Sequence, residues 1–112
     1  KTCGSPPLLG VSLSAGAITQ ADGTPAINLT WSPSTDETGG EKDVVRYVLW
    51  RRTGGVTDWG TPYVAIPAGS ASYSYVDAGV TSGQNYQYQL AAQDCTPSLS
   101  TSPATSSVVT IP

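Results

Sequence analysis

The sequence predicts an all-β protein, a seven-stranded antiparallel sandwich of two sheets, on three observations. Twelve glycines and nine prolines punctuate the whole length of 112 residues. The short intervals between them are rich in valine, threonine, tyrosine and tryptophan, which favour strands over helices. Several intervals alternate apolar and polar residues with the period of two of a half-buried strand. A chain of this length buries a single core, so residues 1–112 are expected to form one domain.

The first two strands are expected on either side of a tight turn. The first interval spans residues 8–15, and the later Asp22-Gly23 pair suits a reversal of the chain. The second interval spans residues 26–32 and alternates cleanly. Its expected inward face carries three large apolar side chains, Ile27, Leu29 and Trp31.

The next three strands are expected between proline-containing and glycine-containing turns. The third, over residues 44–52, places Tyr47 and Leu49 on one face. The fourth, over residues 62–68, contains two prolines and is expected to be a short edge strand. The fifth is expected over residues 71–77.

The strongest alternation comes near the end of the chain, in residues 85–94. One face of this sixth strand carries its apolar side chains, Tyr86, Tyr88, Leu90 and Ala92. A Ser/Thr/Pro-rich loop is expected over residues 96–107, followed by a seventh strand over residues 107–112. Short strands at this spacing imply a sandwich with Greek-key connections.

The two cysteines, Cys3 and Cys95, form either a disulfide or a pair of free thiols. Because the chain has no histidine and no CxxC spacing, a zinc or iron–sulfur site lacks ligands. Buried free thiols would suit a cytosolic protein, but Cys3 lies in a Gly/Pro-flanked terminus that is a poor place to bury one. We therefore expect the bridge, which closes most of the chain into one loop and contributes roughly 4–5 kcal/mol. A disulfide implies an oxidising, extracellular location.

Two segments of the chain resemble fibronectin type III domains. The run LTWSPSTDETGGEKDVVRYVLWRR is similar to the second strand, loop and third strand of that family, in which the matching positions are Trp31, Pro33, Asp36, Gly39-Gly40 and Tyr47. The run YVDAGVTSGQNYQYQLAAQD is similar to the fifth and sixth strands, with Val80 before the turn and Tyr86 as the tyrosine-corner residue. The resemblance implies an immunoglobulin-like sandwich of type III topology over nearly the whole chain. It implies little about function, because such domains act as spacers, adhesion modules and ligand readers.

The chain departs from the family at two points. The Cys3–Cys95 pair is not part of the family's usual pattern, although the type III fold would place both residues at one end of the sandwich. The sequence contains no RGD tripeptide, so the integrin-binding motif of the best-known members does not transfer.

Four carboxylates gather between the second and third strands, and they suggest either a metal site or a turn. Asp36, Glu37, Glu41 and Asp43 carry the oxygen ligands that Ca²⁺ requires, but their spacing is not that of a preorganised calcium loop. The resemblance makes Asp36 the family's loop aspartate, whose carboxylate accepts backbone N–H bonds and fixes the turn. We therefore expect no metal ion and no cofactor. A calcium-dependent adhesin is the alternative, and it predicts that calcium raises the melting temperature.

Other classes of function are disfavoured by composition. An acyl-transfer triad lacks a histidine base, and the carboxylates lie in expected loops or strand ends, so we expect no catalytic residues and no enzyme. A net charge of −3 with five scattered basic residues gives no surface for nucleic acid. No apolar run is long enough to span a membrane.

The outer face of the third and sixth strands is the candidate binding surface. It is expected to carry Arg46, Val48, Trp50, Arg52, Gln87, Gln89 and Gln93, and we call it the Trp50 face. An aromatic ring flanked by guanidinium and amide groups can stack on a sugar or anchor a protein. The alternative is that neighbouring side chains or the following loop cover Trp50. Trp59 and Tyr63, in that loop, are expected either to pack on the sandwich or to form an aromatic platform.

The predicted function is a non-catalytic structural or cell-adhesion module of a larger secreted or cell-surface protein, with a surface appendage subunit as one setting. Its partner is then a protein, a neighbouring domain or another copy. The alternative is a carbohydrate-binding accessory module of a secreted enzyme, whose partner is a polysaccharide. Asn28-Leu29-Thr30 is a glycosylation sequon in form.

The disulfide gives the first testable prediction. Titration of the unfolded, unreduced chain with a thiol reagent is expected to find no free thiol. Reduction is expected to lower the melting temperature, because the unfolded chain gains loop entropy. A count of two free thiols would exclude the bridge and remove the main sequence argument for an extracellular location.

Overall fold

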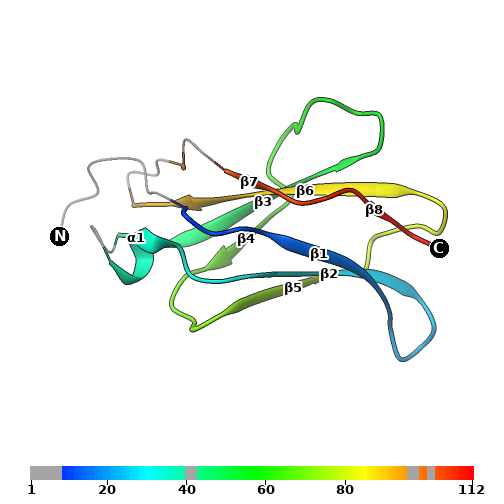
Figure 1. The fold of residues 1–112 in the computed structure, drawn as a ribbon, viewed down its shortest axis with the longest axis horizontal. Helices are drawn as coiled ribbons and strands as arrows, with labels where there is room; N and C mark the ends of the chain where they lie inside the picture. The colour runs from blue at the N-terminus through cyan, green and yellow to red at the C-terminus, as the bar shows by residue number, and fades with distance from the viewer. Residues whose placement is uncertain (1–8, 40–42, 96–98, 101–102) are drawn as a thin grey trace.

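The computed structural model describes residues 9–39, 43–95, 99–100 and 103–112. In these ranges the chain forms eight strands and one short helix (Figure 1). Their bounds are β1 Ser14–Thr19, β2 Pro25–Trp31, α1 Thr35–Thr38, β3 Arg46–Thr53, β4 Val64–Pro67, β5 Tyr73–Asp77, β6 Asn85–Gln93, β7 Ala104–Thr105 and β8 Val109–Thr110.

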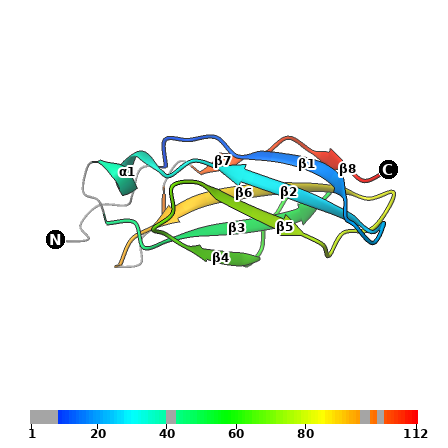
Figure 2. The same ribbon diagram turned by 90° about the horizontal axis from the view of Figure 1, so that it is seen from below.

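The strands form two antiparallel sheets that pack face to face. One sheet has the order β1-β2-β5, and the other has the order β4-β3-β6-β7, with β8 also paired to β6. The sheet β1-β2-β5 lies along the lower side of Figure 1 and nearest the viewer in Figure 2. The predicted all-β, two-sheet antiparallel sandwich is confirmed.

The first strand differs from its prediction. The ladder with β2 begins at Ser14 and ends at Thr19, whereas the sequence predicted residues 8–15. Leu9 and Leu13 are nevertheless buried at 1% and 7% exposure. Alternation reports which side chains are buried, and an extended segment can bury them without pairing its backbone. The following turn lies where it was predicted, with the N–H of Gly23 donating to the carbonyl oxygen of Gln20 at 2.9 Å.

The predicted seventh strand, over residues 107–112, contains β8, and a bulge separates β8 from β7, which lies in the predicted loop. Thr105 in β7 pairs with Gln89, and Val109 in β8 pairs with Tyr86, so four steps along one strand match three steps along β6. Ser106 occupies the gap, and its hydroxyl oxygen accepts the N–H of Tyr88 at 3.0 Å. The sequence missed β7 because its Ser/Thr/Pro-rich surroundings are typical of a loop.

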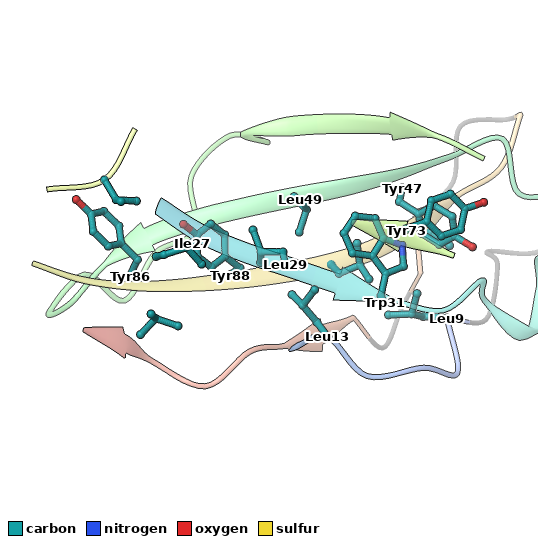
Figure 3. Packing of buried hydrophobic residues seen from close by; sticks show 14 of the residues in the cluster. Leu9, Leu13, Ile27, Leu29, Trp31, Tyr47, Leu49, Tyr73, Tyr86 and Tyr88 are labelled. Atoms are coloured by element: carbon teal, nitrogen blue, oxygen red, sulfur yellow. The ribbon is translucent and has the colours of Figure 1, made fainter. Parts of the chain in front are cut away.

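The core lies between the sheets and includes the side chains that the alternation predicted to face inward (Figure 3). The nine predicted inward residues are all at most 5% exposed: Ile27, Leu29, Trp31, Tyr47, Leu49, Tyr86, Tyr88, Leu90 and Ala92. Tyr73 stacks on Trp31 at 5.6 Å between ring centroids, with Tyr47 at 4.7 Å from Tyr73. The hydroxyl of Tyr86 accepts the N–H of Thr81 at 2.9 Å, as a tyrosine corner requires.

The two ends of the sandwich carry different features. At one end, which we call the α1 end, lie α1, the start of β3 and the end of β6, and the carbonyl oxygen of Leu9 accepts the N–H of Thr35. The last residue, Pro112, lies at the opposite end in Figure 1. The described part of the chain therefore enters at one end of the sandwich and leaves at the other.

Replacement of the tyrosine-corner residue tests this description. Tyr86→Phe is expected to lower the free energy of unfolding by about 1–2 kcal/mol, because the N–H of Thr81 loses its acceptor. Urea denaturation measures the change. Tyr75→Phe is the matched control, since no hydrogen bond of the Tyr75 hydroxyl is found among the described residues, and it should alter stability by less than about 0.5 kcal/mol. Equal effects of the two substitutions would contradict the assigned role.

Candidate functional site

The acidic stretch between β2 and β3 folds as a short capped helix rather than as the simple turn predicted for it. Ser34 is fully buried, and its hydroxyl oxygen accepts the N–H groups of Asp36 at 3.2 Å and Glu37 at 3.1 Å. These bonds satisfy donors that a helix start leaves open. The spacing Ser34-x-x-Glu37 is a helix-start signal that could have revealed α1 from the sequence. Ser34, which the sequence analysis did not consider, thus caps the start of α1, and the turn-fixing role expected of Asp36 stays a prediction.

Glu37 joins α1 to both sheets. Its carboxylate accepts the hydroxyl of Tyr47 at 2.5 Å, the hydroxyl of Tyr73 at 2.8 Å and the N–H of Gly69 at 3.1 Å. Burial first, and then the hydrogen bond to Glu37, raise the pKa of Tyr47 above its ordinary value. The two tyrosines come from β3 and β5, and Figure 3 shows them beside Trp31. This carboxylate therefore fastens the α1 end of the sandwich and does not face outward as a free metal ligand.

The other carboxylates of the stretch do not gather around Glu37. Asp36 lies in the first turn of α1, Asp43 is buried at 3% exposure just before β3, and Glu41 lies outside the described residues. Within the described ranges no group of three or more His, Cys, Asp or Glu side chains is arranged to hold a metal ion. The absence of a metal site, predicted from the spacing, stays a prediction.

The residues predicted to form the Trp50 face are neighbours on β3 and β6. Arg46 pairs with Gln93, Trp50 with Gln89 and Arg52 with Gln87 in the ladder of these two strands. Arg46 donates to the side-chain oxygen of Gln93 at 2.7 Å, and Arg52 donates to that of Gln87 at 2.8 Å. Much of this face is thus held together by hydrogen bonds among its own side chains.

Trp50 itself is covered. It is 9% exposed and forms a small cluster with Val48 and Ala91, against which Trp59 and Leu99 pack. Trp59 comes from the loop after β3, which was the covering segment considered from the sequence. A binding role for the Trp50 face stays a prediction, and the surface it offers is the edge of this cluster rather than an open indole ring.

Trp59 and Tyr63 lie on opposite sides of β3, so they do not form one aromatic platform. The guanidinium of Arg52, on the outer face, stacks over the ring of Trp59 at 4.1 Å. The guanidinium of Arg51, on the inner face, stacks over the ring of Tyr63 at 4.2 Å. Adjacent residues of a strand point to opposite faces, so the aromatic ring stacked on each arginine lies on the same face as that arginine. Each ring also has one face occupied by an arginine.

The inner face holds a buried carboxylate that the sequence analysis missed. Asp77, at 1% exposure, accepts four hydrogen bonds. The donors are Arg51 at 2.9 Å, Tyr63 at 2.8 Å, Tyr88 at 2.6 Å and the N–H of Gly79 at 3.1 Å. Arg51 occupies a core-facing position two residues after Leu49, and a charged residue there is the sequence signal that could have predicted a buried partner.

The hydrogen bonds and the ion pair of Asp77, which we call the Asp77 network, have the electrostatics of a structural rather than a catalytic group. Burial alone would raise the pKa of Asp77, but the hydrogen bonds from Tyr88, Tyr63 and Arg51 hold it below its ordinary value. Burial and the bond to Asp77 raise the pKa of Tyr63 to about 12 and that of Tyr88 further. At neutral pH the carboxylate is ionised and both hydroxyls are protonated, so these groups do not exchange protons in the range that general acid–base catalysis uses.

The remaining predicted positions lie as follows. Cys3 lies outside the described residues, so the Cys3–Cys95 bridge stays a prediction. The geometry of the described part is compatible with it, because Leu9 is buried at the α1 end, where β6 ends two residues before Cys95. Asn28 is half-buried in β2, between β1 and β5, and its glycosylation is also untested. Among the described residues, none of the helical structure is long and apolar enough to cross a membrane.

Comparison with curated proteins finds short matches inside much longer chains. No family model matches. The chain is 36% identical over 68 residues to an amylopullulanase of Thermoanaerobacterium saccharolyticum, a match over 61% of this chain and 5% of that protein. It is 34% identical over 85 residues to an amylopullulanase of Thermoanaerobacterium thermosulfurigenes, over 76% of this chain and 4% of that protein. The chain thus spans about a twentieth of the length of these relatives.

Comparison with solved structures finds the same sandwich in other contexts. The twitchin kinase region from C. elegans, a chain described as Fn31-NL-kin-CRD-Ig26, matches with a TM-score of 0.59 and 20% identity, over 78% of this chain and 14% of that one. Pectate lyase PelI from Erwinia chrysanthemi in complex with tetragalacturonic acid matches with a TM-score of 0.53 and 20% identity, over 88% of this chain and 27% of that one. At these identities the matches establish the fold.

Removal of the Asp77 charge tests the structural role of the Asp77 network. Asp77→Asn is expected to lower the free energy of unfolding by about 3 kcal/mol, because Arg51 loses its buried partner. Since the folded-state pKa of Asp77 lies below the ordinary value of 3.8, its contribution is complete above that pH and is lost as the pH falls further.

Thermal unfolding between pH 2 and pH 7 measures this contribution. The wild type is expected to lose more stability below about pH 4 than Asp77→Asn does. Asp58→Asn, an exposed loop carboxylate, is the control and should leave both the stability and its pH dependence unchanged. Parallel pH profiles for wild type and Asp77→Asn would show that the network does not stabilise the fold electrostatically.

Proposed function

The chain folds as a fibronectin type III-like β-sandwich, and from that premise we propose that it is a non-catalytic structural module of a larger extracellular protein. Its task is to hold neighbouring domains at a fixed separation and to present them for protein contacts or adhesion. The matches show a type III-like domain that is related to a small segment of much larger proteins. The structural role and the extracellular location are the proposal.

The observation that carries the proposal is the anchoring of the described chain at opposite ends. At the α1 end, Leu9 is 1% exposed and bonded to Thr35. At the other end, Ile111 is 1% exposed, its N–H donates to Gln84 at 3.0 Å, and its carbonyl oxygen accepts the N–H of Gly83 at 2.9 Å. Tension applied at Leu9 and Ile111 therefore acts on packed core residues.

The interior is suited to such a load because polar bonds connect the two sheets. Asp77, at the end of β5, is bonded to Arg51 of β3 and Tyr88 of β6. At the α1 end, Glu37 connects Tyr47 of β3 with Tyr73 of β5. Buried charge-assisted bonds of this kind are directional, so they resist sliding of one sheet over the other more than apolar packing does.

The relatives support the setting of a larger carbohydrate-active protein. Two proteins named amylopullulanase contain a segment similar to this chain, which is only about a twentieth of their length. A short all-β segment in such a protein fits a spacer or accessory module. We infer an extracellular location on the same ground, together with the predicted disulfide.

A carbohydrate-binding module is the second candidate, because these relatives are named for glucans and because PelI, which shares the fold, is described in complex with tetragalacturonic acid. The geometry favours it less. Binding of sugar rings depends on open aromatic faces, whereas Trp50 is covered, and Trp59 and Tyr63 lie on opposite sides of β3 beneath arginines.

The structural role is tested by measuring the distance across the module. Two fluorescent proteins are fused before Lys1 and after Pro112, which keeps Cys3 in the chain, and energy transfer between them is recorded in increasing urea. We expect one constant transfer efficiency up to the unfolding transition, and then a single step. A glycine–serine linker of equal length is the control, and it should show no step. A broad or drifting efficiency before unfolding would contradict a rigid spacer.

Electrophoresis of the chain without fluorescent proteins distinguishes the two candidate functions. The gels contain pullulan, amylopectin or polygalacturonate. A spacer is expected to migrate at the same rate with and without polysaccharide. Retardation that Trp59→Ala abolishes would replace the structural proposal with the carbohydrate-binding one. Val56→Ala, on the same exposed loop, serves as the matched control.

A further inference from the structure

Asp43 is a buried carboxylate for which the described residues offer no partner. It is 3% exposed, and among these residues no donor is hydrogen-bonded to either of its two oxygens. An isolated ionised carboxylate that loses water without gaining a partner is strongly unfavourable, so buried carboxylates are found paired, hydrogen-bonded or bound to a cation. The described structure accounts for the buried carboxylate of Asp77 in this way, but not for that of Asp43.

The position of Asp43 places a second buried carboxylate nearby in the topology. The N–H of Val45 donates to the carbonyl oxygen of Gln93 at 2.8 Å, and Arg46 pairs with Gln93 in the ladder. Asp43 lies two residues before Val45 on one strand, and Asp94, which is fully buried, immediately follows Gln93 on the other. Two acidic side chains therefore leave the same end of the β3–β6 pair, at the α1 end.

The described arginines do not neutralise Asp43. Arg46 donates to Gln93, Arg52 donates to Gln87 and lies over Trp59, and Arg51 forms the one ion pair found among the described residues, with Asp77. The two lysines of the chain, Lys1 and Lys42, lie outside those residues. Among the described residues, no ion pair of Asp43 is found.

We propose that Asp43 and Asp94 bind a hard divalent cation, of the Ca²⁺ class, at the α1 end. Ca²⁺ is bound by oxygen atoms in a flexible geometry that combines carboxylates with backbone carbonyls and water. Because the described residues hold no third acidic or sulfur ligand arranged with these two, the carboxylates supply the charge, and backbone oxygens and water complete the shell. The site uses only one member of the acidic stretch from which the sequence suggested calcium, together with a residue 51 positions later.

The inference does not depend on the proposed function. A cation between the segment that leads into β3 and the segment that leaves β6 would cross-link neighbouring strands at the end where α1 packs. It would bind the folded chain and not the unfolded one, so it would stabilise the fold by mass action. Calcium is abundant outside cells, and such a site would respond to it there.

The experiment measures the melting temperature of the 112-residue chain, first treated with a chelator, in 0 to 10 mM CaCl₂ at constant ionic strength. For the wild type we expect a rise of roughly 4–8 °C at saturation, equivalent to about 1 kcal/mol for a domain of this size. Asp43→Asn is expected to remove the rise or to weaken the affinity at least tenfold. Asp58→Asn, remote and exposed, should retain it. Isothermal titration with CaCl₂ alone gives an independent affinity.

Three results would overturn the proposal. The first is an unchanged melting temperature with no heat of binding. The second is a rise that Asp43→Asn leaves intact, which would place calcium elsewhere. The third is the absence of a calcium effect together with a stability loss in Lys42→Gln, which would make the Lys42 ammonium the partner of Asp43. Because Asp43→Asn removes a buried charge and keeps the side-chain volume, it is expected to remain folded, and circular dichroism checks this.

Discussion

The carboxylate of Asp77 is the interaction on which the interior of this sandwich depends. It lies at the end of β5, in one sheet, and accepts bonds from Arg51 and Tyr88 of the other sheet. A buried carboxylate with four donors is stable only if every donor keeps its place, so the network specifies the relative position of both sheets, the loop that carries Tyr63 and the turn at Gly79. Apolar packing would tolerate small shifts that this network does not.

The same principle recurs at the α1 end, where Glu37 accepts hydrogen bonds from Tyr47 and Tyr73. Figure 3 shows these two tyrosines beside Trp31. The two carboxylates secure opposite parts of the interface between the sheets, while apolar residues fill the space between them. Asp43 stands out against this pattern because it is nearly as buried as Asp77 and more buried than Glu37, yet no hydrogen bond to its carboxylate is found among the described residues. A bound cation would give it the equivalent of what the other two obtain from tyrosines and arginine.

The surface carries less functional information than the aromatic content of the sequence suggested. Arg51 and Arg52 are consecutive, so they point to opposite faces of β3, and each orders one aromatic ring of the following loop. The loop thereby covers Trp50 and contributes Tyr63 to the Asp77 network. The rings of Trp59 and Tyr63 fix the loop and do not form an open binding surface. This agrees with a structural module in which Leu9 and Ile111 are anchored at opposite ends of the sandwich.

The sequence by itself determined which side chains face inward along each strand, because a strand alternates with a period of two whatever it pairs with. It also determined the turn at Asp22-Gly23 and, through Trp31, Tyr47 and Tyr86, the type III-like fold. The tertiary structure decided where backbone pairing begins and ends. Leu9 and Leu13 are buried outside any strand ladder, and Ser106 interrupts the pairing of β7 and β8 with β6. The tertiary structure also decided the hydrogen bonds that Asp77 and Glu37 accept. Alternation assigns Asp77, Arg51 and Tyr88 to faces, but only the register and packing of two sheets bring three residues from three strands to one point.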